Sequence, residues 1–114
     1  MSKFQKTNLL KTSKENLDPK LTQQVFISKN VMVVYYVYEP GLEFPDHTHP
    51  QEQVTIIQKG KLLVTIDGEE MKLIQGDICA IPPNVIHSSK VIGNSRVETI
   101  SIFTPVSDRV VIQK

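Results

Sequence analysis

The chain has 114 residues, of which 22% are charged, and its formal net charge is +1. This length predicts one domain with a core large enough to fold without disulfides. A net charge close to zero gives the molecule no strong electrostatic attraction to nucleic acid, and the longest apolar run, 31–38, is far too short to span a membrane. We therefore expect neither nucleic acid nor a membrane as a partner.

Residues 1–24 are predicted to form an N-terminal arm of the same domain. Five lysines against two acidic residues give the segment 1–20 a net charge of +3. A basic arm can bind nucleic acid, but this one has no arginine and only Phe4 as an aromatic, so a solvated terminus is the simpler interpretation. Leucines within 7–18 allow a short helix, which Asp18-Pro19 would end.

The rest of the chain, 25–114, has the pattern of a β domain. Runs of β-branched and aromatic residues predict strands over 31–38, 54–57, 62–66, 71–74, 78–81, 87–92 and 96–103. Turn residues separate these runs, and Asp67-Gly68 is a strong signal for a two-residue hairpin. Turns at intervals of about eight residues favour a sandwich or barrel of short antiparallel strands.

Two of the three histidines, His47 and His49, lie two residues apart. In an extended strand, residues i and i+2 share a face, so both imidazoles would point to one place. Gln53 has the same parity and can join them. Glu52 has the opposite parity and would point outward, unless a bulge near Pro50 shifted the register.

These residues resemble the first of two sequence motifs that mark the cupin superfamily. That motif places a glycine, a His-x-His pair, a glutamate and a second glycine at fixed spacing. Here the matching residues are Gly41, His47, His49, Gln53 and Gly60, so only the glutamate is changed.

The second cupin motif has a glycine, a Pro-x-Gly turn, a histidine and a final asparagine. Gly76, Pro82 and His87 match it, whereas Asn84 replaces the turn glycine and Val91 the final asparagine. The change to Asn84 is mild, because asparagine tolerates the left-handed backbone conformation better than most residues.

The resemblance spans residues 25–105 and implies an all-β fold, a double-stranded β-helix or jelly-roll barrel. In cupins the two motifs lie on neighbouring strands inside the barrel. The resemblance therefore implies that His87 joins His47, His49 and Gln53 as metal ligands. It also implies a homodimer.

A centre of three histidines and one glutamine is neutral apart from its metal. Its ion keeps the full charge of +2, acts as a strong Lewis acid and favours anionic oxygen ligands. Nickel, zinc, iron(II) and manganese(II) all suit such ligands, and the sequence does not distinguish them. We expect one divalent transition metal.

The sequence motif His-x-His-Pro-x-Glu-Gln and the segment 102–105 resemble the corresponding sequences in one branch of small cupins. These are the pectin-degradation cupins, which convert a 4,5-unsaturated uronate to its linear keto form. The branch implies metal-assisted isomerisation or tautomerisation of a small oxygen-rich anion, such as a sugar acid or a keto acid.

The chain departs from that branch at two positions. Ser101 stands where the branch has an aspartate, and Ser107 stands where it has an arginine, the nearest arginine being Arg109. A hydroxyl is a poor general base at neutral pH, so no catalytic residue is assigned. The candidates for the pocket are Phe103, Ser101, Tyr36 and Phe44.

Two other functions stay open: a metal-dependent dioxygenase, and a non-catalytic module that binds a small molecule or a metal. The predicted ligands differ from the two-histidine, one-carboxylate triad of many iron oxygenases, so the dioxygenase is the less favoured enzyme. The single cysteine, Cys79, excludes an intrachain disulfide and reads as a small buried hydrophobe. With no secretory segment apparent, we expect a cytoplasmic protein.

Overall fold

The structure is a computed structural model that describes residues 3–106. Ser107 and Arg109 therefore lie outside the described residues. The described part forms one short 3-10 helix and ten strands: η1 (Leu9–Lys11), β1 (Glu15–Asp18), β2 (Leu21–Ile27), β3 (Met32–Tyr38), β4 (Glu43–His47), β5 (Glu52–Lys59), β6 (Leu62–Ile66), β7 (Glu69–Leu73), β8 (Ile78–Ile81), β9 (His87–Val91) and β10 (Val97–Thr104).

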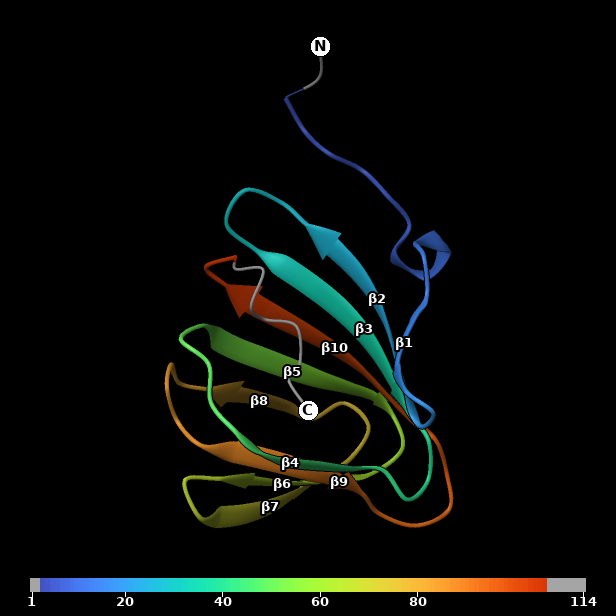
Figure 1. Ribbon diagram of the computed structural model, residues 1–114, viewed down its shortest axis with the longest axis vertical. Helices are drawn as coiled ribbons and strands as arrows, with labels where there is room; N and C mark the ends of the chain where they lie inside the picture. The colour runs from blue at the N-terminus through green and yellow to red at the C-terminus, as the bar shows by residue number, and fades with distance from the viewer. Residues whose placement is uncertain (1–2, 107–114) are drawn as a thin grey trace.

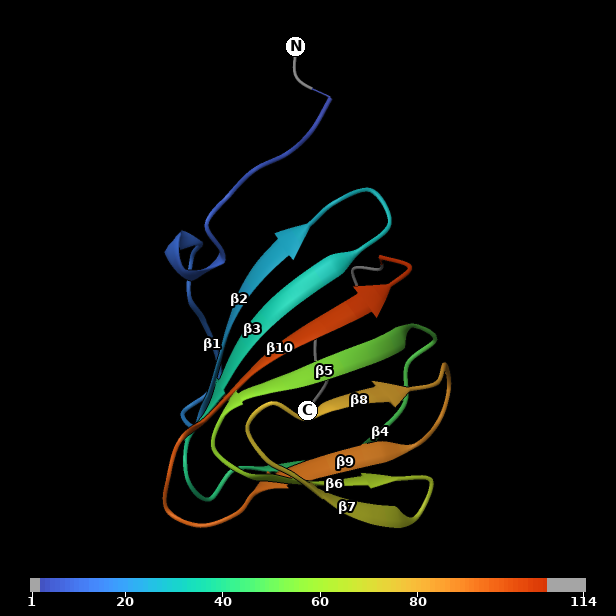
Figure 2. The ribbon, with the colours of Figure 1, turned by 180° about the vertical axis from the view of Figure 1, so that it is seen from behind.

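The strands form two sheets in which every pairing is antiparallel. The larger sheet has the order β1-β2-β3-β10-β5-β8, and the smaller one has the order β4-β9-β6-β7. Figures 1 and 2 show the smaller sheet facing one end of the larger one, while the N-terminal segment extends beyond β1 and β2. This arrangement is the predicted jelly-roll barrel.

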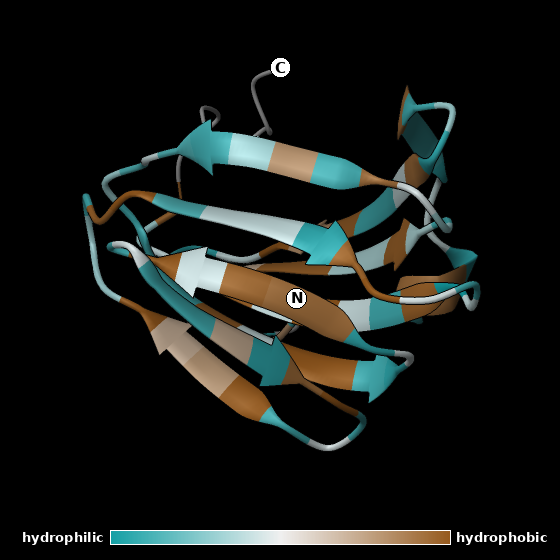
Figure 3. Cartoon of the chain, turned by 90° about the horizontal axis from the view of Figure 1, so that it is seen from below, coloured by the Kyte–Doolittle hydropathy of each residue, from teal (hydrophilic) through white to brown (hydrophobic). Residues whose placement is uncertain are grey.

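The core lies between the sheets because inward and outward residues alternate along the strands. In β3, Met32, Val34, Tyr36 and Tyr38 are buried, while the residues between them are only partly covered. Strand β10 repeats this alternation. Figure 3 shows hydrophobic bands along the strands and largely hydrophilic turns at their ends.

Two N-terminal strands were missed by the sequence analysis. The short helix allowed within 7–18 is present as the single 3-10 turn η1. Residues of β1 instead pair with β2, and Leu17 packs against the core. Because both strands belong to the larger sheet, the barrel begins well before residue 25. Burial of Leu17 in a hairpin outweighs the weak helical preference of an isolated leucine pattern.

No helix within residues 3–106 is long and apolar enough to cross a membrane.

Gly60 sits at the tight β5–β6 turn with a backbone φ of +86°. A Cβ atom added there would lie 2.6 Å from the carbonyl oxygen of Arg96 and 2.9 Å from Cγ2 of Val97. Gly68, in the β6–β7 turn, has a similar φ of +82°, but an added Cβ would meet nothing within 4 Å. Comparing alanine substitutions at these two glycines therefore separates the cost of backbone strain from the cost of steric overlap.

We expect Gly68→Ala to cost about 1 kcal/mol of unfolding free energy, from the left-handed backbone alone. Gly60→Ala should cost at least about 3 kcal/mol, because overpacking adds to the same strain. Urea unfolding of both variants measures the difference. Equal losses would show that the chain at Gly60 moves freely enough to accept the methyl group.

Candidate metal centre

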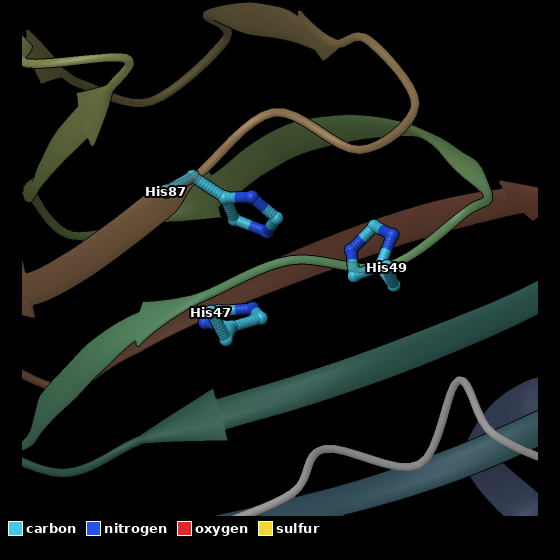
Figure 4. A group of neighbouring side chains, drawn as sticks. All are labelled: His47, His49 and His87. Carbon is cyan, nitrogen blue, oxygen red and sulfur yellow. The ribbon is translucent and has the colours of Figure 1, made fainter.

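The three histidines reach one place because two strand ends meet. His47 is the last residue of β4 and His87 is the first residue of β9, and the antiparallel register pairs them directly. His49 follows in the connection to β5. One nitrogen from each ring lies within 4.8 Å of the others. Figure 4 shows the three rings gathered around one shared space.

Each ring is oriented by a hydrogen bond from Nδ1 to a backbone carbonyl two residues away. The distances are 2.9 Å from His47 to Pro45, 3.0 Å from His49 to Gln51 and 2.9 Å from His87 to Val85. A carbonyl oxygen only accepts, so Nδ1 must carry the proton of each neutral ring. The lone pair is then on Nε2, which is the state that binds a metal.

The connection that carries His49 is tied to the second motif. The N–H of Asn84 donates to the carbonyl oxygen of His49 at 2.8 Å. Asn84 has a φ of +65°, the left-handed conformation that the usual turn glycine would adopt easily. Asparagine in place of glycine therefore keeps this link between the two motifs.

Burial favours the neutral form of His47 and His87. His87 is only 5% exposed, and burial, followed by the neighbouring His47 and His49, lowers its pKa to about 4. Burial also lowers the pKa of His47, against the opposing effects of its hydrogen bond to Pro45 and of the nearby Asp46. The buried Nε2 of His87 has no hydrogen-bond partner among the described residues. A metal ion would satisfy that lone pair, so the residues present fit the predicted metal.

Gln53, in β5, presents its side-chain oxygen to the same space. Its Oε1 lies 3.0 Å from Nε2 of His49. Since the proton of His49 is on Nδ1, two lone pairs face each other across this distance. Both atoms are of the kinds that bind a transition metal, so a cation held by His49 and Gln53 together would relieve this opposition.

Glu52 is exposed and is not among the residues that line the space around the histidines, whereas Gln53 is, in keeping with the parity argument. One assumption behind that argument is wrong, however. His47 and Gln53 do not share a strand, because the chain leaves the smaller sheet after His47 and enters the larger sheet at Glu52. Side-chain exposure nevertheless alternates from residue 47 to residue 53. The odd-numbered residues therefore stay the more buried ones, although the chain passes from one sheet to the other.

A chain of buried polar groups orients the amide of Gln53. Its Nε2 donates to Oγ1 of Thr55 at 2.9 Å, and Oγ1 of Thr55 lies 2.9 Å from Oγ of Ser101. The amide nitrogen is thus held away from the histidines. Ser101 is fully buried behind Thr55 and does not line the cavity, so it is wrong as a pocket residue. Sequence reasoning missed Thr55, although its parity matches that of Gln53.

The histidines border a cavity of about 80 Å³ between the sheets. The predicted pocket residues Tyr36, Phe44 and Phe103 line it. The ring of Phe44 lies 5.1 Å from that of His47, and the ring of Phe103 lies 5.7 Å from that of His49. These three candidates are therefore walls of the cavity.

Two other groups in the wall are poor proton acceptors. Burial raises the pKa of Tyr36 well above its ordinary value, and its buried hydroxyl has no partner among the described residues. Cys79 also lines the cavity, and burial raises the pKa of its thiol. A protonated thiol is a weak nucleophile, which agrees with a packing role for Cys79.

The model of the cupin domain family matches residues 34–103, more than half of the chain. The protein belongs to the cupin domain family. No curated protein matches its sequence significantly.

Solved structures share the fold over nearly the whole chain. A cupin described as RmlC-like, from Shewanella frigidimarina, is 25% identical, with a TM-score of 0.83 over 92% of this chain and 94% of that one. KdgF from Halomonas sp. is 20% identical, with a TM-score of 0.80 over 90% and 94%. A predicted oxalate decarboxylase from Thermotoga maritima is 16% identical, with a TM-score of 0.79 over 90% and 100%.

The lowered pKa of His87 predicts how the stability of the metal-free cupin depends on pH. The ordinary pKa of 6.5 applies in the unfolded chain, where the ring takes up a proton more readily than in the fold, where its pKa is about 4. Stability linked to His87 is therefore lost as the pH falls from about 6.5 toward 4.

His87→Gln should remove that loss. Between pH 7 and pH 4.5, unfolding free energy should fall further in the wild type than in the variant, by roughly 1–2 kcal/mol. Solvent screening near the cavity reduces the full value of about 1.36 kcal/mol per pKa unit. Urea titrations of metal-free protein at several pH values measure the difference. If the unfolding free energies of the wild type and the variant fell equally with pH, the loss of stability would not come from His87.

Thr55→Val tests whether the polar chain orients Gln53. The substitution keeps the shape of the side chain but removes the acceptor for the Gln53 amide, so the affinity for nickel or zinc should fall about tenfold. Competition with a chromophoric chelator measures it. Ser101→Ala is the matched control, because it leaves the Thr55 hydroxyl in place and should have a smaller effect. An unchanged affinity in Thr55→Val would mean that Gln53 needs no such support.

Proposed function

We propose that this cupin holds one divalent transition metal through His47, His49, His87 and Gln53. We further propose that it acts on a small oxygen-rich anion by metal-assisted isomerisation or tautomerisation. The observation that carries the proposal is the convergence of three Nε2 lone pairs, each fixed by a hydrogen bond from Nδ1 to the backbone. Nickel, zinc, iron(II) or manganese(II) would suit this ligand set.

The neutral ligands define the chemistry that such a site offers. A bound ion would polarise a carbonyl oxygen and stabilise negative charge that develops on it. Because no ligand carries a negative charge, nothing within the donor set reduces this effect. The protein's own contribution is to hold four donor atoms in place and to exclude water with the rings of Phe44 and Phe103.

The motif resemblance to pectin-degradation cupins supports an isomerase acting on a sugar acid or a keto acid. The position of Ser101 limits that support. An aspartate could move a proton during tautomerisation, whereas Ser101 is a hydroxyl sealed behind Thr55. Proton exchange would therefore depend on the acidity that the metal gives to the substrate, with solvent as the proton source.

One observation favours a second candidate, a cupin that binds its ligand without turnover. No aspartate or glutamate is among the described residues that line the cavity. Without such a carboxylate, the site lacks the most usual acid or base for moving a proton at carbon. Binding and turnover must therefore be measured separately.

Exchange of substrate protons in deuterated water separates the two candidates. With metal-loaded protein, the proton on the carbon next to the carbonyl of a keto acid should exchange more than about tenfold faster than with free metal. Proton NMR follows the loss of signal. His47→Ala should lose both the metal and the exchange. Binding without faster exchange would favour the non-catalytic module, and no metal binding at all would refute both.

A further inference from the structure

We propose that the outer face of the larger sheet is a docking surface for a second copy of this chain. This face points away from the metal centre, so the inference goes beyond the proposed function. It rests on the register of five neighbouring strands, β2, β3, β10, β5 and β8, which aligns apolar side chains outside the core.

Two neighbouring rows of apolar side chains, here called the outer rows, cross this face. The first row consists of Phe26, Val33, Ile102, Val54 and Ala80, which are paired in register from β2 to β8. The second row consists of Tyr35, Ile100, Ile56 and Ile78, which are paired in register from β3 to β8. Each of the nine side chains is at least partly exposed.

The outer rows lie outside the core of their own chain. In β3 and β10 the alternate residues are the buried ones, so the outer-row residues of these strands point to the opposite face. None of the nine is among the residues that form the core or pack against it. Ile78, on the edge strand β8, is 65% exposed. A contiguous apolar surface of this kind is typical of an interaction site.

The N-terminal segment covers one end of this face. Gln24 of β2 continues the second row beyond Tyr35, and it is buried. Its Nε2 donates to the carbonyl oxygens of Leu10 at 3.0 Å and of Thr12 at 3.1 Å, which fixes the segment around η1 over β2. From β3 to β8 the outer rows stay partly exposed. The chain thus closes the β2 end of the face and leaves the remainder for a partner.

The distribution of charge favours a second copy as that partner. In a two-fold dimer, residues near the axis meet their own counterparts, so a charge there would face a like charge. None of the nine outer-row residues is charged. Beside them, Glu98 accepts a hydrogen bond from Tyr35 and is paired in register with Lys59, so its charge is matched within the chain. The net charge of +1 adds little repulsion between copies.

The area of the face also suits a dimer. Strands about 4.8 Å apart that rise about 3.3 Å per residue give these five strands a flat area of roughly 500 Å². The relief of the side chains enlarges it toward the roughly 800 Å² that each partner contributes to a stable interface. Two such faces can pack with their strands about 30° apart and their apolar rows interdigitated, as in a β-sandwich.

Sedimentation velocity of the 114-residue chain over a range of micromolar concentrations tests the proposal. The wild type should sediment as a species of twice the chain mass of 12.9 kDa. Ile100→Glu, in the middle of the face, should raise the dissociation constant of the dimer at least about a hundredfold, because each copy would bury an unpaired carboxylate.

Leu63→Glu is the matched control. It makes the same kind of change at a partly buried position of the smaller sheet, where Leu63 is paired in register with Lys72 and Lys90. The dissociation constant should be unchanged in this variant. Ile78→Lys keeps the test independent of folding, because a side chain that is 65% exposed contributes little to the packing of a single chain. It should raise the dissociation constant about tenfold.

Circular dichroism of each variant checks that the barrel is intact. A wild type that stays monomeric at every concentration would overturn the inference. Equal dissociation constants for folded Ile100→Glu and Leu63→Glu would also overturn it, as would an unchanged constant in Ile78→Lys. Metal binding, measured in the same samples by competition with a chelator, reports on the proposed function separately.

Discussion

The hydrogen bonds from the three Nδ1 atoms to backbone carbonyls are the constraint on which this site depends. Each bond fixes where the proton lies on a ring and which way the ring turns. The carbonyls belong to Pro45, Gln51 and Val85, residues placed by strand ends and by the turn around Asn84. The barrel backbone therefore sets the direction of the lone pairs, and the metal-binding geometry follows from the register between β4 and β9.

Holding neutral histidines in this way has an energetic consequence. Rings crowded together in a partly apolar space resist protonation, which is why the pKa of His87 falls to about 4. An unpartnered buried nitrogen also costs free energy until something binds to it. A metal ion that binds this centre in the folded barrel would therefore raise the free energy of unfolding.

The sequence predicted the convergence of the three histidines better than it predicted the N-terminal strands. His47, His49 and His87 follow from motif spacing, because that spacing reflects a backbone arrangement shared across the superfamily. Gln53 followed from parity, although the chain changes sheets between His47 and Gln53. The hairpin of β1 and β2 could not be read locally, since the burial that stabilises it comes from contacts distant in sequence. For the same reason, Thr55 and the sealed position of Ser101 required the register between β5 and β10.

This contrast explains why a metal site can be carried over from a motif more safely than a reaction. The ligands point to one place as soon as the backbone is correct, so a match in spacing implies a match in geometry. A residue that moves a proton must also face open space, and this depends on what its neighbours fill. At Ser101 the neighbour is Thr55, which turns toward it and lies between it and the cavity. The cavity is lined by side chains from both sheets, and no single motif contains them all. A motif that fixes the histidines therefore leaves the rest of the cavity wall, and with it the choice of reaction, undetermined.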